Sequence, residues 1–317
     1  MLGERQASPR VLVVGWGFIG SAIGHRLLAG GVSVTGLTRS RTAATEAGLA
    51  AGAHMVVGDA SRPELLDETL RGIDHVVFSV GGMSPPAAAA EPVAAVAKTL
   101  LPLLCVLEAL RHRPHIALTY LSSGGAVYGN PARLPVRETD RTEPVSPYGA
   151  LHLACEDYAQ MYARRFGVRL QILRCSNVYG PNQSSRGDQG AVAIFLDRVA
   201  RGLPLHVFGD GSALRDYVLV DDVADAVARV IVDRLDVGVV NLGSGRGLTV
   251  LDIAEAVGDV VGRRAIIEFA SERGIDVRAV VLDISRLQSF ITYTPMEFAR
   301  GLRLTSAASR AVGTPAV

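Results

Sequence analysis

The sequence has few cysteines, and neither sign of charge is in excess. Its three cysteines, Cys105, Cys155 and Cys175, lie far apart, and no CxxC pair suggests a zinc or redox site. We therefore expect no metal, and a reducing compartment, the cytoplasm. Lys and Arg number 32 against 31 for Asp and Glu, so the formal net charge is +1. Because no basic surplus can offset a long phosphate backbone, we expect no nucleic-acid partner.

Long hydrophobic runs are also absent. No uninterrupted apolar stretch reaches the roughly 18 residues that a membrane span needs. The N-terminal stretch MLGERQASPR is polar. We therefore expect neither a signal peptide nor a membrane partner. The hydrophobic share of 49% over 317 residues nevertheless supports a sizeable core.

Short apolar runs alternate with helical patterns through the first half of the chain. Strand-like runs occur at 11–14, 32–37, 54–57, 75–80, 115–121 and 169–174. Apolar residues recur at helical spacing over 18–29, 62–71, 92–112 and 147–166. This alternation predicts an α/β fold, a Rossmann-type doubly wound parallel sheet covered by helices on both faces.

The rhythm changes after about residue 176, where SNVYGPNQSSRGDQG reads as a loop too long to be a mere connector. Helical patterns follow at 191–202, 223–233 and 250–261, with strands near 205–208, 216–220 and 238–242. We expect an NAD(P)-binding domain over 1–176 with contributions from 216–246, and a smaller interleaved substrate lobe from 177–215 and 247–317. The Ala- and Pro-rich segment 81–95 is expected to be mobile, and the tail 305–317 to be frayed.

Three glycines in VVGWGFIG follow the G-x-G-x-x-G spacing between the first strand and the first helix. In that context the first glycine makes the turn, the second lets the backbone approach a pyrophosphate, and the third lets helix and strand pack closely. The helix N-terminus favours the negative charge of the ligand. The expected cofactor contacts of this turn are Gly15, Gly17, Phe18, Ile19 and Gly20.

The end of the second strand lacks the acid that usually binds the ribose 2′-hydroxyl of NAD. The segment GLTRSRTA offers Arg39, Ser40 and Arg41 instead, which suit a 2′-phosphate. This favours NADP slightly and leaves NAD open. Further cofactor contacts are expected at the ends of the third and fourth strands, from Asp59, Ala60 and Ser79.

Three segments, YLSSGGAVYG (120–129), SPYGALHLACE (146–156) and RCSNVYGPNQ (174–183), carry a resemblance to a known family. They resemble the extended short-chain dehydrogenase/reductases, in the nucleotide-sugar epimerase/dehydratase branch, and the UDP-glucose 4-epimerases in particular. The resemblance continues through 190–227, 241–255 and 282–285. It implies a Rossmann fold, a nicotinamide cofactor and a nucleotide-sugar substrate.

The resemblance implies a Tyr that acts as general acid and base, and a Lys four residues later that binds the nicotinamide ribose and lowers the Tyr pKa. Tyr148 matches the Tyr, but the Lys position is His152. A Lys stays charged at pH 7, whereas a His with its usual pKa near 6.5 is mostly neutral. Since i, i+4 spacing puts both side chains on one helix face, they can contact a common ligand. Activity is expected to persist in a reduced or more pH-dependent form.

The family also implies a Ser or Thr that shares the hydrogen bond of the Tyr. In many epimerases this residue stands four positions before the Tyr of VYG, which is Tyr128 here, and that position is Gly124. Ser123 is the next candidate and the predicted catalytic and substrate-binding hydroxyl. Ser122 would point to the opposite side of a continuing strand.

Substrate contacts are carried over from the resemblance. Asn177 and Arg215 are expected at the sugar-nucleotide diphosphate, which a guanidinium can bind in a bidentate manner. The alternative for Arg215 is an ion pair with Asp216. The remaining expected contacts are Val207 and Phe208 at the nucleobase, and Arg278 at phosphate.

Two reactions and one non-catalytic role stay open. Family dehydratases carry an Asp-Glu pair where this chain has Gly124 and Gly125, so dehydration is disfavoured. A 4-epimerase acting through a transient 4-keto sugar is favoured over an NADPH-dependent 4-ketoreductase, and a catalytically silent nucleotide-binding sensor is the third alternative. The family also implies a homodimer formed by the helices at 92–112 and 147–166.

Overall fold

A parallel sheet of seven strands forms the centre of the computed structural model, which describes residues 8–81 and 83–311. Its strands are β1 (Arg10–Val14), β2 (Ser33–Thr38), β3 (His54–Val57), β4 (His75–Phe78), β5 (Ala117–Ser123), β6 (Arg169–Cys175) and β10 (Val239–Leu242). They pair in the order β10-β6-β5-β4-β1-β2-β3, and every pair is parallel. Because the order reverses beside β1, the sheet is doubly wound, and the predicted fold class is confirmed.

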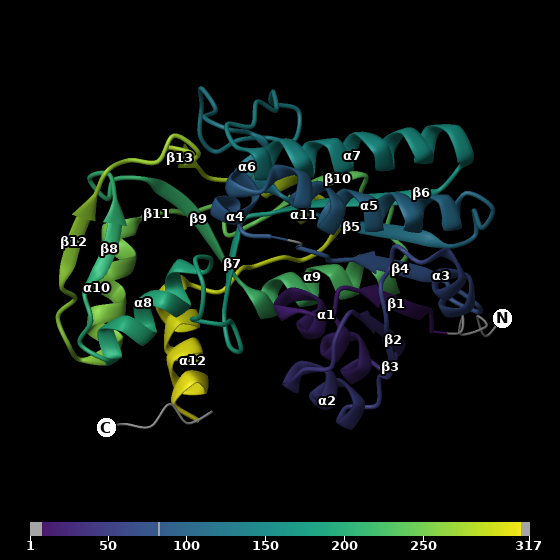
Figure 1. Cartoon of the computed structure of the whole chain (residues 1–317), viewed down its shortest axis with the longest axis horizontal. Coiled ribbons are helices and arrows are strands. Elements are labelled where there is room, and N and C mark those ends of the chain that lie inside the picture. The colour runs from purple at the N-terminus through teal and green to yellow at the C-terminus, as the bar shows by residue number, and fades with distance from the viewer. Residues whose placement is uncertain (1–7, 82, 312–317) are drawn as a thin grey trace.

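Helices cover both faces of this sheet, which explains its near-continuous apolar strands. One face carries α1 (Phe18–Ala29), α2 (Ala43–Ala50), α9 (Val220–Val232) and α11 (Ser285–Phe290). The other carries α3 (Pro63–Thr69), α5 (Pro92–Leu110) and α7 (Pro147–Phe166). Figure 1 shows α5 and α7 above the sheet, with α1 and α9 side by side below it.

Helix α7 has well-defined ends, and this positions the residues on its first turns. The Ser146 hydroxyl accepts a hydrogen bond from the Gly149 N–H at 3.2 Å, and Pro147 is the first helical residue. Gly167 ends the helix in the left-handed region, with φ of 71°. The bounds are those predicted from the sequence, 147–166.

Helix α5 is long and apolar enough to cross a membrane, judged by length and composition alone, and it is the one such helix in the part of the chain described. Its Leu103, Val106 and Leu107 are fully buried against the sheet, as in the core helix of a globular domain. Val93 and Leu101 are exposed. These exposed apolar side chains are compatible with the predicted dimer contact, which stays a prediction.

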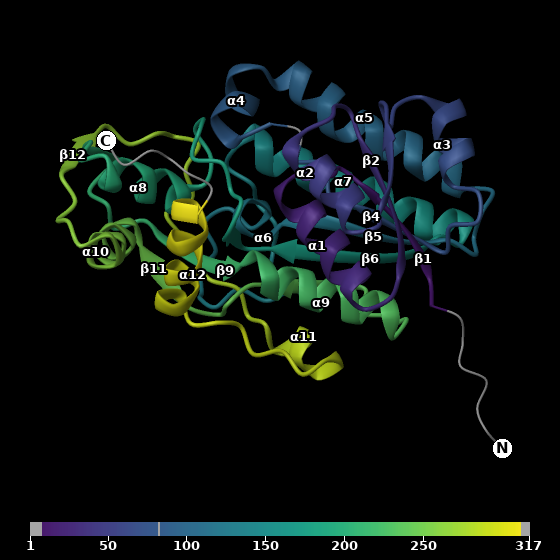
Figure 2. The ribbon, with the colours of Figure 1, turned by 90° about the horizontal axis from the view of Figure 1, so that it is seen from below.

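A smaller lobe follows β6 along the chain, and Figure 2 shows it beside the large sheet. It contains the helices α8 (Ala191–Ala200), α10 (Val250–Val261) and α12 (Phe298–Ala311). Its strands are β7 (Asn177–Tyr179), β8 (Leu205–Phe208), β9 (Leu214–Leu219), β11 (Gly247–Thr249), β12 (Ile267–Ala270) and β13 (Ala279–Val280). Strands β11, β9 and β13 form one sheet with β7 on β9, and β12 pairs with β8.

Three local expectations are refined by the structure. The segment 81–95, expected to be a mobile entry to a helix, contains helix α4 (Pro85–Ala90), which is capped by the Ser84 hydroxyl at the Ala87 N–H. The expected loop after residue 176 is present over 180–190, and β7 occupies the residues before it. The tail is helical as far as 311, since α12 buries Thr305 and Ser306, while 312–317 lie outside the described residues.

The predicted domain bounds stay a prediction, but the elements inside them are now assigned. Within 216–246, helix α9 and strand β10 belong to the large sheet and its cover. Strand β9 pairs instead in the smaller lobe, between β11 and β13. The two parts of the fold are therefore interleaved at this point of the chain.

Candidate active site

The candidate residues gather at one edge of the large sheet. Since all seven strands are parallel, their carboxyl ends meet at the same edge, and ligands of such sheets bind there, where the strand order reverses. Gly15 follows β1, Ser79 follows β4, and Ser123 ends β5. The sequence motifs are thus brought together by the topology.

The glycine turn has the geometry that a dinucleotide site needs. Gly15 has φ of 97°, and a Cβ there would lie 2.9 Å from the backbone of Ser79 and Val80. A Cβ at Gly20 would lie 2.0 Å from the Gly15 carbonyl oxygen. A Cβ at Gly17, the N-cap of α1, would meet no atom within 4 Å, so this side of the helix N-terminus is open. Backbone N–H groups there are free to face a phosphate.

The other expected cofactor residues surround this turn. The Ser79 hydroxyl donates to the Gly15 carbonyl at 2.8 Å, so it supports the turn. The Asp59 carboxylate accepts the Ser61 N–H at 2.8 Å, beside buried Ala60. Arg39 and Ser40 are exposed after β2. The expected cofactor residues Phe18 and Ile19, at the start of α1, are half-buried.

Tyr148 and Ser123 form the core of the candidate site. Tyr148 lies on the first turn of α7, and Ser123 ends β5. Burial raises the pKa of the Tyr148 phenol, and the nearby Ser123 side chain opposes this shift. The two residues predicted from the sequence therefore lie near each other, and their catalytic roles stay a prediction. Among the described residues, no cation contributes to the shift of the Tyr148 pKa.

His152 lies one helical turn after Tyr148, with ring centroids 4.5 Å apart. Its side chain is buried, which lowers its pKa to about 4, so the ring is neutral at pH 7. Its Nδ1 lies 2.7 Å from the Tyr120 hydroxyl oxygen. Its Nε2 is buried without a partner among the described residues. The residue expected to bind a ribose hydroxyl therefore has an unpartnered ring nitrogen, Nε2, that is available to do so.

Side chains at Gly124 and Gly125 of SSGGAVYG would meet close neighbours. A Cβ at Gly124 would lie 2.8 Å from the Arg174 carbonyl oxygen and from a methyl group of Leu282. A Cβ at Gly125 would lie 2.8 Å from Asn177 Oδ1. The hydroxyl of the motif therefore comes from Ser123, and no acid fits at either position without a shift of the neighbours.

A buried polar network below the site was not predicted. Glu156 is fully buried, accepts the Ser122 hydroxyl at 2.5 Å and pairs with the Arg174 guanidinium at 2.7 Å. Arg174 also donates to Tyr128, which in turn donates to Asn241. Ser122 points away from the site, as strand alternation predicts. Sequence spacing gave no signal for contacts between residues so far apart in the chain.

The expected substrate residues divide into exposed and buried groups. The Arg215 guanidinium donates to the carbonyls of Leu214, Val277 and Arg278, and none of the ion pairs among the described residues involves it. Asp216 instead accepts bonds from Ser244, so the alternative of an Arg215–Asp216 pair is wrong. Asn177 lies near Gly125, at the edge of the candidate site, and Arg278 is exposed.

Val207 does not line the site. Its side chain is buried in the core of the smaller lobe, because β8 alternates and turns Val207 inward. Phe208 is exposed instead, with the Arg273 guanidinium 3.9 Å from its ring centroid. Of the two residues expected at the nucleobase, only Phe208 therefore exposes its side chain.

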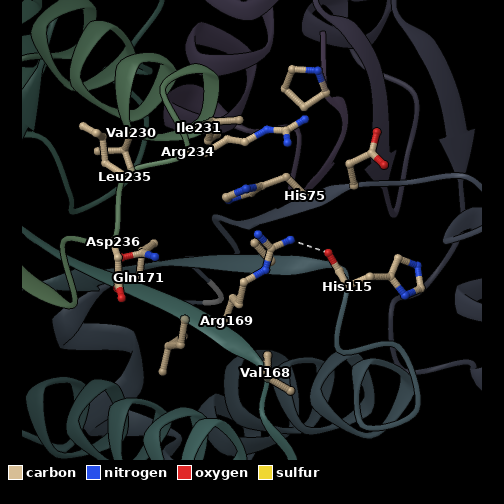
Figure 3. A pocket seen from close by; sticks show the side chains of 14 residues that line it. His75, His115, Val168, Arg169, Gln171, Val230, Ile231, Arg234, Leu235 and Asp236 are labelled. Atoms are coloured by element: carbon tan, nitrogen blue, oxygen red, sulfur yellow. Dashed lines mark hydrogen bonds between the residues drawn. The ribbon is translucent and has the colours of Figure 1, made fainter. Parts of the chain in front are cut away.

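A cavity of about 430 Å³ lies at the opposite edge of the sheet. Figure 3 shows its lining by side chains near the amino ends of β4, β5 and β6, among them His75, Arg169 and Arg234. Asp74 and Asp236 balance the two arginines, and Arg169 donates to the His115 carbonyl. None of the predicted site residues lines this cavity, and its balanced charge gives no preference for phosphate.

Comparison with known proteins agrees with the geometry of the site. Residues 11–243 match the model of the NAD dependent epimerase/dehydratase family. The chain belongs to this family. The predicted resemblance is confirmed, as is the expectation of an enzyme of the epimerase type rather than a reductase.

Three relatives in this family match along nearly their whole length. A UDP-glucose 4-epimerase of Mycolicibacterium smegmatis is 32% identical, covering 93% of this chain and 97% of the relative. The solved UDP-glucose 4-epimerase of Thermus thermophilus, a complex with NAD, is 34% identical with a TM-score of 0.89, covering 96% of this chain and 100% of that one. That of Thermotoga maritima, with UDP-glucose, is 30% identical with a TM-score of 0.89, covering 96% and 99%.

Proposed function

We propose that this chain is an NAD-dependent epimerase that inverts C4 of a nucleotide-linked hexose through a transient 4-keto sugar. The observation that carries the proposal is the proximity of Tyr148 to Ser123 at the carboxyl edge of the sheet that also holds the dinucleotide turn. Gly124 and Gly125 supply no separate acid and base, which disfavours loss of water. Similarity to UDP-glucose 4-epimerases over nine-tenths of the chain supports the same reaction.

The residues of the site fit a nicotinamide dinucleotide. Gly17 leaves open space at the helix N-terminus for the pyrophosphate, and the unpartnered Nε2 of His152 can donate to the nicotinamide ribose. Asp59 would face the adenine half. Bound NAD supplies the acceptor, and then the donor, of the hydride at C4.

Among the two dinucleotides we propose NAD. The exposed Arg39 suits a 2′-phosphate by charge, but the relative solved with cofactor holds NAD, and the preference for NADP finds no support there. Thr38 donates from its side chain to the Ser40 carbonyl at 3.3 Å, a bond within the turn that carries Arg39. The identity of the dinucleotide released from the purified protein decides the point.

Tyr148 accepts a proton from the substrate and returns it. Its phenolate accepts the proton of the C4 hydroxyl as the keto sugar forms, and returns it when the hydroxyl is restored. The Ser123 hydroxyl lies near this phenol and can share a hydrogen bond with the same substrate oxygen. Since burial raises the pKa of Tyr148 and His152 is neutral, the rate is expected to rise with pH through the neutral range.

Arg215 and Asn177 would bind the diphosphate of a UDP-hexose. Burial lowers the pKa of the Arg215 guanidinium, but arginine stays charged in proteins. Without a carboxylate partner among the described ion pairs, its charge is available to an anionic ligand. The exposed Phe208 would lie at the uracil end.

One experiment separates the candidate functions. The purified protein is denatured, its released dinucleotide is identified by mass, and the native protein is incubated with UDP-glucose or UDP-galactose without added cofactor. We expect NAD and interconversion, and about a 10²- to 10⁴-fold loss of rate in Tyr148→Phe with NAD retained. Net oxidation of NADPH by a 4-keto sugar would replace the epimerase by a reductase. Bound nucleotide with neither reaction would indicate a silent sensor.

A further inference from the structure

Tyr120 lies beneath His152 in the middle of β5, and both side chains are buried. The Tyr120 hydroxyl oxygen lies 2.7 Å from His152 Nδ1. The two rings are nearly parallel, inclined by 22° with centroids 6.2 Å apart. Tyr120 therefore contacts Nδ1, the imidazole nitrogen other than the unpartnered Nε2.

The direction of this hydrogen bond follows from the donors and acceptors around Tyr120. Burial raises the pKa of the Tyr120 phenol, so it keeps its proton, and the Cys155 thiol is among its other polar neighbours. An imidazole nitrogen is a good acceptor, whereas sulfur is a weak one. The favoured hydrogen bond therefore runs from the Tyr120 O–H to His152 Nδ1.

This arrangement determines which nitrogen of His152 carries the proton. A neutral imidazole has one N–H, and an Nδ1 that accepts from Tyr120 leaves the proton on Nε2. Nε2 is buried and has no partner among the described residues. A buried N–H without an acceptor is unfavourable, and a ligand hydroxyl would remove that penalty. The Tyr148 ring, 4.5 Å away, places this donor beside the reacting group.

We propose that Tyr120 is a positioning residue that holds His152 as the Nε2–H tautomer, so that an uncharged N–H binds the nicotinamide ribose in place of an ammonium group. The proposal rests on the proposed function only for the identity of the ligand. The tautomer itself is a property of the protein without sugar, and it can be measured separately.

The tautomer is tested by nitrogen NMR of protein labelled with ¹⁵N-histidine, with the His152 signals identified by their loss in His152→Gln. We expect a protonated Nε2 and an unprotonated, hydrogen-bonded Nδ1 between pH 6 and 8. Tyr120→Phe should shift the ring to a mixture of tautomers. The matched control, Tyr162→Phe, removes a hydroxyl on α7 that donates to Glu108, and should leave the His152 signals unchanged.

Dinucleotide affinity gives a second readout. Loss of the fixed donor in Tyr120→Phe should raise the Kd for NAD about tenfold, about 1.4 kcal/mol, while Tyr162→Phe leaves it unchanged. Cys155→Ala keeps the Tyr120–His152 bond and should preserve the Nε2–H tautomer, and the wild-type tautomer tests the direction of that bond even if Tyr120→Phe does not fold. A protonated Nδ1 in the wild type, or an unchanged tautomer and Kd in folded Tyr120→Phe, would overturn the proposal. The expected tautomer without sugar interconversion would count against the proposed function alone.

Discussion

Replacement of His152 by lysine is the most direct test of how this chain activates its tyrosine. His152 is neutral because burial lowers its pKa to about 4, and the Tyr148 pKa is raised by burial. A Lys at this position would place an ammonium group near the phenol. Because a positive charge favours the phenolate, the Tyr148 pKa should fall.

The size of the shift follows from the distance between the two side chains. With the ring separation of 4.5 Å as the charge distance, Coulomb's law at an effective dielectric constant of about 20 gives about 4 kcal/mol. That corresponds to a fall of nearly 3 pKa units, and full solvent screening would reduce it to below about 1 unit. Burial of the lysine lowers its own pKa, so the measured shift should lie between these limits.

The assay is the pH dependence of kcat for sugar interconversion, together with the absorbance of tyrosinate in the protein loaded with NAD. In His152→Lys the rise of kcat with pH should begin at a lower pH than in the wild type, by a shift between these two limits. His152→Gln keeps an N–H donor without charge and should leave that pH unchanged, while the absorbance change should disappear in the double variant with Tyr148→Phe. The same pH profile in His152→Lys and His152→Gln would refute the electrostatic reasoning.

Three further predictions concern the rest of the molecule. Arg215→Ala should raise KM for a UDP-hexose about 10- to 100-fold with little change in kcat, because bonds to charged groups contribute about 1.5–3 kcal/mol; an unchanged KM in steady-state assays would remove Arg215 from the site. Glu156→Gln should lower the free energy of unfolding by about 3–5 kcal/mol in urea titrations, since it leaves Arg174 buried without its partner; a loss below 1 kcal/mol would mean that water reaches the pair. Burial lowers the pKa of His75 to about 3. The unfolded chain therefore binds more protons from about pH 3 to about pH 6.5, and stability falls as the pH falls through this window. His75→Gln should flatten that dependence, and an unchanged slope would contradict it.

The elements with a clear apolar period and a defined end could be predicted from the sequence. Helices α1, α7 and α10 have the predicted bounds, and glycines in the left-handed region follow α7 and α10. Helix α12 could not be predicted in this way, because TSAASRA has no apolar stripe, and the burial of Thr305 and Ser306 depends on tertiary contacts. The three-residue strand β7 exists through its pairing with β9, which local sequence does not encode.

The site likewise contains residues that could be predicted from the sequence and residues that could not. The dinucleotide turn, Tyr148 and Ser123 were predictable because motif and topology agree, and Ser123 lies near Tyr148 in the structure. Tyr120 gave no signal, since a tyrosine within a strand is ordinarily a packing residue. Val207 was assigned to the wrong side of β8, because the sequence alone does not say which alternate residues of a four-residue strand face the core.

The geometry of the acid–base pair depends on the register between β5 and α7. Ser122 and Ser123 are adjacent in β5, so their side chains point to opposite sides. Ser122 is bound by Glu156 of α7, and Glu156 is held in turn by Arg174 of β6. A slip of one residue would expose Ser122 to the site and bury Ser123 against a charged pair. The buried ion pair thus fixes the strand position from which Ser123 contacts Tyr148, which is a reason to keep a pair whose burial adds little net stability.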